Sequence, residues 1–192
     1  MTLLILGLVL FLGIHSARVF ADGPRTRFIA QRGENAWKGL YSAVSLLGLV
    51  LLVWGFGLAR QQPVVLWAPP TWARHLAAVL TLPAFVLLAA AYVPGNHIKA
   101  RLHHPMVLGI KVWAFAHLLV VRTLAAEIVF AAFLVWAALS FRAARSRDRA
   151  VGRVYPPGRL VPTVVTVAAG VAAWAGFLMW GHAALIGVRP FG

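Results

Sequence analysis

The chain has 192 residues, of which 61% are hydrophobic and 11% are charged. A soluble domain is about half apolar and about a quarter charged, so this composition excludes a soluble globular protein and predicts an integral membrane protein. The net charge of +14 would indicate nucleic-acid binding in a soluble domain. In a membrane protein, basic loops set topology and contact anionic lipid, so we expect the lipid bilayer as partner and no nucleic acid. Cysteine is absent, which excludes disulfides, thiolate metal sites and thiol catalysis.

A transmembrane helix needs about 20 mostly apolar residues, and six such stretches nearly exhaust the chain. We therefore expect an all-α polytopic membrane helix bundle with about six transmembrane helices, forming a single domain over residues 1–192. The predicted spans are Thr2–Phe20, Gly39–Ala59, His75–Val93, Pro105–Val121, Leu124–Phe141 and Pro162–Ile186. Pro105 suits the first position of a helix, whereas Pro83 is expected to kink the third span.

Polar and basic segments separate the spans. Residues 22–35 contain Gly, Pro and three arginines, and we interpret them as an aqueous loop. Residues 60–72 form a proline-rich turn whose tryptophans suit the headgroup region. Residues 94–104 form a basic loop with three histidines, and residues 142–159 are the most basic segment of the chain.

The basic residues are distributed unevenly between the two ends of the predicted spans. One side holds Arg18, Arg25, Arg27, Arg32, Lys38, Lys99, Arg101, Lys111, Arg142, Arg145, Arg147, Arg149, Arg153 and Arg159. The other side holds Arg60, Arg74, Arg122 and Arg189. Because basic residues accumulate on the cytoplasmic side, we expect both termini on the periplasmic or exterior side of a cytoplasmic membrane.

Histidines are the main candidates for chemistry. The seven are His15, His75, His97, His103, His104, His117 and His182. Only His15 and His117 lie well inside predicted spans, where an ionisable side chain is costly to bury and commonly functional. Two neutral imidazoles on separate helices can hold the iron of a b-type haem. From spacing alone, a haem site and simple hydrogen bonding between helices both stay open.

Two neighbours would complete such a haem site. Trp113 precedes His117 by one turn on the same helix face. Arg18 follows His15 by about one turn, towards the basic side, where it could pair with a propionate. Counted from that side at about 1.5 Å per residue, His15 lies shallower than His117, so His104 remains a competing iron ligand opposite His15. A headgroup contact, a partner contact or a solvated loop are further interpretations of His104.

Short motifs follow one another along the chain. They are Gly13-Ile14-His15-Ser16, His104-Pro105, Gly109-x-Lys111-x-Trp113, Ala116-His117-Leu118 and Ile186-Gly187-Val188-x-Pro190-Phe191-Gly192. In their order and spacing the chain resembles NnrU, a bacterial membrane family named for its association with nitrite and nitric oxide respiration. NnrU is similar in turn to the 15-cis-zeta-carotene isomerase, a membrane haem b enzyme with histidine axial ligands. The resemblance implies a single NnrU-like transmembrane domain in a bacterial inner (cytoplasmic) membrane, with haem b ligated by His15 and His117.

Three functional hypotheses follow. The first is a redox or accessory component of nitrite and nitric oxide respiration (denitrification), working beside other respiratory proteins of the membrane. The second is a haem-dependent cis-trans isomerase of a carotenoid-like polyene. The third is a scaffold or assembly subunit without a catalytic role. The sequence has no phosphate-binding loop, zinc-protease signature, Ser-His-Asp order or dinucleotide fingerprint, so no residue is assigned as catalytic.

Overall fold

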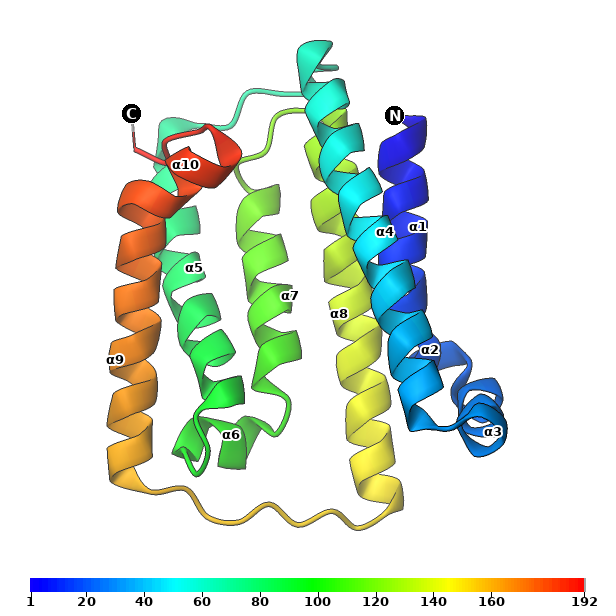
Figure 1. Ribbon diagram of the computed structural model, residues 1–192. Coiled ribbons are helices and arrows are strands. Elements are labelled where there is room, and N and C mark those ends of the chain that lie inside the picture. The colour runs from blue at the N-terminus through cyan, green and yellow to red at the C-terminus, as the bar shows by residue number, and fades with distance from the viewer. Residues whose placement is uncertain (192) are drawn as a thin grey trace. The chain divides into compact units, whose positions relative to one another are not determined.

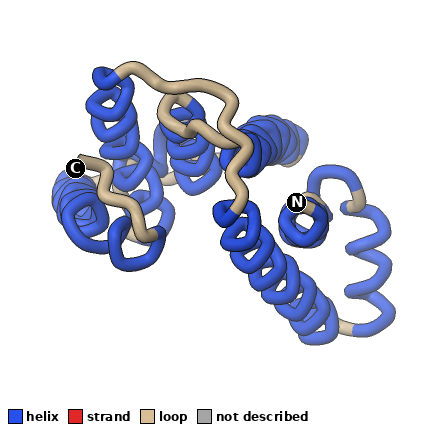
Figure 2. Tube along the Cα trace, turned by 90° about the horizontal axis from the view of Figure 1, so that it is seen from above, coloured by secondary structure: helices blue, strands red, loops and turns tan. Residues whose placement is uncertain are grey.

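The computed structural model describes residues 1–191, and helices make up most of this trace (Figure 1). In chain order the elements are α1 (Thr2–His15), α2 (Ala17–Phe20), α3 (Asp22–Arg32), α4 (Glu34–Gln61), α5 (Thr71–Tyr92), α6 (His97–Leu102), α7 (Pro105–Leu118), α8 (Leu124–Ala150), α9 (Leu160–Gly176), the π-helix η1 (Phe177–Gly181) and α10 (His182–Ile186). Loops link the helices and form the tail that follows α10 (Figure 2). The all-α prediction is confirmed for the described residues. Gly192, the last residue of the closing sequence motif, lies outside them.

Four helical segments are long and apolar enough to cross a membrane, as a polytopic membrane protein requires. They are Glu34–Gln61, Thr71–Tyr92, Leu124–Ala150 and Leu160–Ile186. Two further apolar helices, α1 and α7, have 14 residues each. These six elements coincide with the six predicted spans, but the first and fourth are shorter helices than expected.

A side-chain hydrogen bond to the backbone marks the place where the first span is interrupted. Ser16 separates α1 from α2, and its hydroxyl donates to the carbonyl oxygen of Leu12 at 2.6 Å. Such a side-chain bond back to the preceding turn competes with regular helix geometry.

The fourth span ends early because the chain beyond α7 takes up other backbone bonds. The N–H of Leu66 donates to the carbonyl of Arg122 at 2.8 Å, and that of Leu124 donates to Val64 at 2.9 Å. Residues 122–124 are therefore extended and pair with residues 64–66 through an antiparallel bridge, and they do not continue the helix.

Most of residues 22–35, expected to be an aqueous loop, is helical, because α3 occupies Asp22–Arg32. Pro24 falls in the first turn of α3, where a missing N–H has no helical acceptor to lose. Asp22 stands at the same end, where a negative charge favours a helix. Gly33 then ends α3 with a φ of 85°, which suits a residue without a Cβ.

Helix α8 also extends nine residues beyond the predicted end of its span at Phe141. The added turns, residues 142–150, are mostly Ala and Arg, which are good helix formers. The first half of the most basic segment of the chain is therefore helical.

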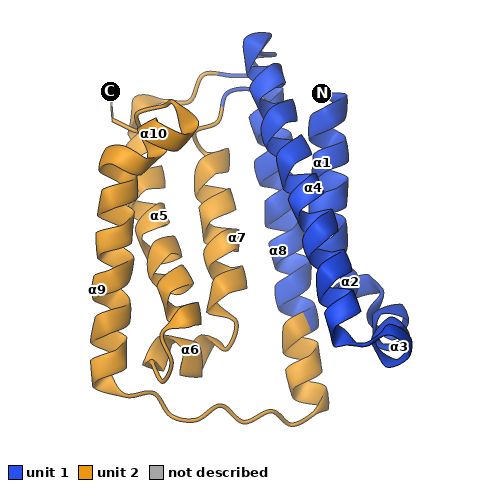
Figure 3. Cartoon of the chain, in the orientation of Figure 1, with its two compact units in different colours: residues 1–67, 122–143 blue, residues 68–121, 144–192 orange. Residues whose placement is uncertain are grey.

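The contacts divide the chain into two compact units (Figure 3). Unit 1 comprises Met1–Trp67 and Arg122–Ala143, and unit 2 comprises Ala68–Val121 with the described residues from Ala144 onward. Our single-domain prediction spans both units.

In unit 1, α1 packs closely along α4. A Cβ added at Gly7 would lie less than 3.0 Å from backbone atoms of Leu52, and one added at Gly55 would lie equally close to Leu4. Leu4, Leu8 and Leu52 are buried together with Ala125 of α8. Glycine thus lets two helix backbones approach, as small residues do in membrane bundles.

In unit 2, α5 packs against both α7 and α9. Small residues again form the contacts, since a Cβ at Gly170 of α9 would clash with the backbone of Val86 on α5. Trp174 of α9 donates its indole N–H towards the carbonyl of Ala78, 3.1 Å away. Helix α5 runs through Pro83 as a single helix.

Candidate functional site

His15 ends α1 among aromatic side chains of unit 1. Its Nδ1 lies 2.6 Å from the carbonyl oxygen of Phe11, one turn earlier. Its ring centroid is 4.3 Å from that of Phe11, 5.1 Å from Tyr41 and 6.1 Å from Trp136. Because a carbonyl oxygen only accepts, Nδ1 carries the proton and the lone pair stands on Nε2.

His117 lies in the last turn of α7, in unit 2, with the same local bond. Its Nδ1 is 2.8 Å from the carbonyl oxygen of Trp113, and the two rings lie 5.0 Å apart. Trp113 and His117 therefore lie side by side on one face of α7, and a role of either in a haem site stays a prediction. The adjacent Ala114 and Ala116 are fully buried.

The expected haem makes few demands on the donor set of the chain. Among residues 1–191, no three His or acidic side chains come together in a group that could hold a metal. A haem iron already has four porphyrin nitrogens and needs only one or two protein ligands. An Nδ1–H bonded to a backbone carbonyl is also the usual way in which proteins orient a ligating imidazole. His15 and His117 each fit that role separately, and their pairing across units 1 and 2 stays a prediction.

The structure places Arg18 next to Asp22 rather than in an isolated position. The Nε of Arg18 lies 3.8 Å from Oδ1 of Asp22, and both side chains are about half exposed. The proposed contact of Arg18 with a propionate stays a prediction.

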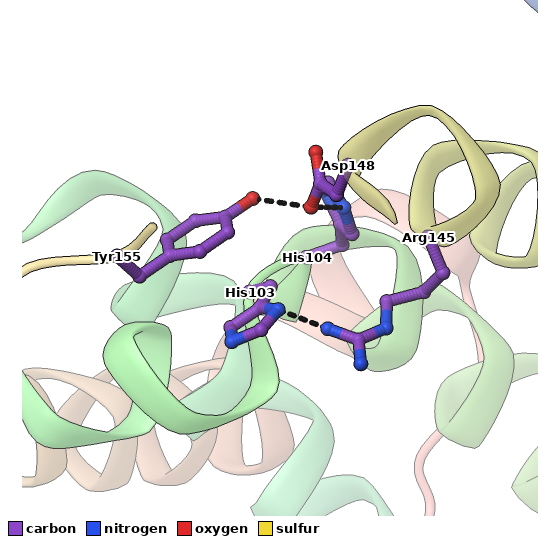
Figure 4. Close-up of polar contacts among 5 residues, drawn as sticks. All are labelled: His103, His104, Arg145, Asp148 and Tyr155. Carbon is purple, nitrogen blue, oxygen red and sulfur yellow. Dashed lines mark hydrogen bonds and ion pairs between the residues drawn. The ribbon is translucent and has the colours of Figure 1, made fainter. Parts of the chain in front are cut away.

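A second cluster of polar side chains lies at the basic end of unit 2 (Figure 4). His104, the residue before α7, places Nε2 2.8 Å from Oδ2 of Asp148 on α8. Tyr155, in the link between α8 and α9, donates its hydroxyl to the same oxygen at 2.7 Å. One carboxylate oxygen thus accepts from two segments, and the exposed fraction of Asp148 is only 8%.

His103 completes this cluster from the turn between α6 and α7. Its ring stacks on that of Tyr155, with centroids 4.0 Å apart and planes 8° apart. The guanidinium of Arg145 donates to its Nδ1 (Figure 4). His103 has a φ of 67°, the left-handed region that non-glycine residues seldom adopt. The guanidinium carbon of Arg153 lies 5.5 Å from the ring centroid of Tyr155.

Burial controls the protonation of the cluster. Loss of hydration lowers the pKa of His104, and this outweighs the opposite effects of the hydrogen bond and charge of Asp148. The imidazole is therefore neutral near pH 7 and donates Nε2–H to the carboxylate. Burial, and then the bond to Asp148, raise the pKa of Tyr155. His104, Asp148 and Tyr155 together form what we call the polar clamp. Its two hydrogen bonds tie the link between α8 and α9 to the start of α7.

Sequence reasoning identified His103 and His104 but missed their partners. The signal for Asp148 was its isolation, since it is the sole acid among the arginines of residues 142–159. An acid in such a segment is available to pair with a nearby histidine. Nothing in the sequence pattern pointed to Tyr155.

One of three comparisons with known proteins places the chain in a family. A family model described as NnrU protein matches residues 3–190, nearly the whole length. Neither the curated proteins nor the solved structures gave a match to the chain.

Proposed function

The chain belongs to the NnrU family, and from that premise we propose a haem b protein of the bacterial inner membrane. In this proposal it spans the membrane six times, with both termini on the periplasmic side. It ligates one haem b through His15 and His117 and serves nitrite and nitric oxide respiration as a redox or accessory component.

The six-span topology is supported by six apolar elements, of which four are long enough to cross a bilayer outright. Helices α1 and α7 are about 21 Å long at 1.5 Å per residue, so each needs flanking residues to span a hydrocarbon core of about 30 Å. Helix α2 provides them for α1. The uneven distribution of arginines and lysines supports the orientation.

The observation that carries the haem assignment is the matching geometry of the two intramembrane imidazoles. Each gives its Nδ1 proton to the carbonyl four residues earlier in its own helix. That bond fixes the ring and leaves Nε2 as the basic nitrogen, which is the atom an iron ligand needs. Aromatic side chains flank both rings and would suit a porphyrin face.

Haem b held in this way would supply a one-electron redox centre. The apolar helices around it would keep water away and so influence the potential. Trp113 would pack beside the His117 ligand, and Arg18, near the basic end of α1, would neutralise a propionate.

A reduced-minus-oxidised absorption spectrum of the purified protein, expressed with haem available, tests the cofactor. We expect a Soret band and the sharp α band of a low-spin, six-coordinate b-type haem, because two imidazoles give a strong ligand field. A preparation without a Soret band would overturn the proposal and favour a scaffold without cofactor. Deletion of the gene in its host tests the process: impaired anaerobic growth on nitrite supports a respiratory role, whereas a change limited to carotenoid isomers indicates the isomerase instead.

A further inference from the structure

Unit 1 has an open apolar groove beside His15, to which no role has yet been given. It runs between the N-terminal helices α1 and α2 on one side and α8 on the other, with a volume of about 530 Å³. Leu12, Gly13 and Ser16 line one wall, and Val135, Trp136 and Ser140 line the other. Volumes of roughly 300–1,000 Å³ are typical of small-molecule sites.

Two hydrogen-bonding groups in this groove have no partner within the described residues. They are the indole Nε1 of Trp136 and the hydroxyl of Ser140, one turn apart on α8. Ser140 is only 8% exposed. Buried polar groups are almost always hydrogen-bonded, and two neighbouring donors in an apolar wall indicate a ligand that carries an acceptor oxygen.

The charges around the groove are positive at one end. Arg142 is exposed two residues beyond Ser140, and Arg18 follows Ser16 by two residues. The acid at this end, Asp22, lies within 4 Å of both Arg18 and Arg25. At the other end the lining residues are Val9, Ala131 and Ala132, so the groove passes from an apolar end to hydroxyl and indole donors and then to cationic side chains.

We propose that this groove binds one anionic phospholipid of the surrounding bilayer. An acyl chain lies along the apolar walls, and an ester carbonyl accepts from Nε1 of Trp136 and the hydroxyl of Ser140. The phosphate meets Arg142 at the basic end. The same order of apolar, ester and anionic groups is found along a phospholipid, and the assignment depends on the membrane location but not on haem.

Gly13 provides a way to block the groove without disturbing the helices. A Cβ built on Gly13 meets nothing within 4 Å, so Gly13→Leu projects into the empty space. Gly57 of α4 has the same freedom and does not line the groove. Gly57→Leu is therefore a matched control that makes the same chemical change on another helix.

The experiment is native mass spectrometry of the full chain released from nanodiscs of equal parts phosphatidylglycerol and phosphatidylcholine. We expect wild type and Gly57→Leu to retain one phosphatidylglycerol at an activation energy that removes other lipids. Gly13→Leu should lose it, and Ser140→Ala should retain less. Arg142→Gln should reduce the preference for phosphatidylglycerol over phosphatidylcholine.

Several results would overturn the proposal. Retention in Gly13→Leu equal to that in Gly57→Leu would exclude the groove as the site. Equal retention of the two lipids by wild type would exclude recognition of the anionic headgroup. A retained mass that is not a phospholipid would assign the groove to another ligand. A circular dichroism melt of each variant separates loss of lipid from loss of fold.

Discussion

The two histidines in the last turns of apolar helices and the two on the basic loop are held in different ways. His15 and His117 each bond the carbonyl four residues earlier in their own helix. His103 and His104 instead bond Arg145 and Asp148, which are 42 and 44 residues further along the chain. A bond within one helix orients a ring whatever else the protein does, whereas a bond between distant segments joins them. The difference suggests a ligand-binding role for the first pair and a structural role for the second.

Removal of an iron ligand tests this division most directly. His15→Ala and His117→Ala should each abolish or strongly change the low-spin b-type haem spectrum, because each leaves the iron with one axial imidazole at most. His104→Ala should keep the wild-type spectrum, since its Nε2 bonds Asp148. The measurement is the reduced-minus-oxidised spectrum at equal protein concentration. If His104→Ala loses the spectrum and His15→Ala keeps it, His104 is the ligand and the comparison is reversed.

The clamp should fail when its shared acceptor is removed. Asp148→Ala leaves the Nε2–H of His104 and the hydroxyl of Tyr155 without their acceptor. A buried donor without a hydrogen bond destabilises the folded state, whereas an exposed donor can bond water instead. We expect the link between α8 and α9 to open more often, so that trypsin cleaves at the exposed Arg153 several-fold faster. Asp22→Ala, a change at the half-exposed acid of α3, is the control. Equal cleavage rates in the two variants would contradict a structural role for the cluster.

Tyr155→Phe should have a smaller effect on the same cleavage rate. It removes the hydroxyl that donates to Asp148 but keeps a ring that can stack on His103. Since His104 still donates to the carboxylate, the rate should fall between those of wild type and Asp148→Ala. A rate equal to that of Asp148→Ala would mean that the hydroxyl, and not the pair of donors, holds the link.

The fold was largely predictable because apolar length is a strong signal. All six predicted spans coincide with apolar helical elements, and α7 begins at Pro105 as the position of that proline indicates. The errors occurred where polar composition was taken to mean a loop. Residues 22–32 form α3 because Pro24 is harmless in a first turn, and residues 142–150 extend α8 because Ala and Arg favour helices.

The candidate sites were predictable only in part. An isolated histidine inside an apolar run is visible in any sequence, so His15 and His117 could be named as candidate ligands. The clamp depends on contacts between residues more than 40 positions apart, and periodicity within one helix carries no information about such contacts. The groove of unit 1 is formed by α1, α2 and α8 together and is equally invisible in the pattern of any single segment.

The smallest expected effect is a pH dependence of the clamp through His104. Burial places its pKa below the ordinary value of about 6.5, so the open form of the link binds a proton more readily than the closed form. Above that value both forms are neutral and this group contributes no pH dependence. As pH falls below about 6.5 the open form gains protons first, and opening becomes more favourable until the closed form also titrates. Near the imidazole, His103 and Arg145 favour the neutral form and Asp148 favours the charged one.

Nuclear magnetic resonance titration of the labelled imidazoles measures this shift, with His104→Gln used to assign the resonance. The pKa of His104 should lie below about 6.5, and Asp148→Asn should lower it further, because that change removes the negative charge that favours protonation. A pKa of His104 at or above about 6.5 in the wild type would show that burial does not control this group. His104 would then be a solvated loop histidine, and its contrast with His15 and His117 would no longer rest on a buried clamp.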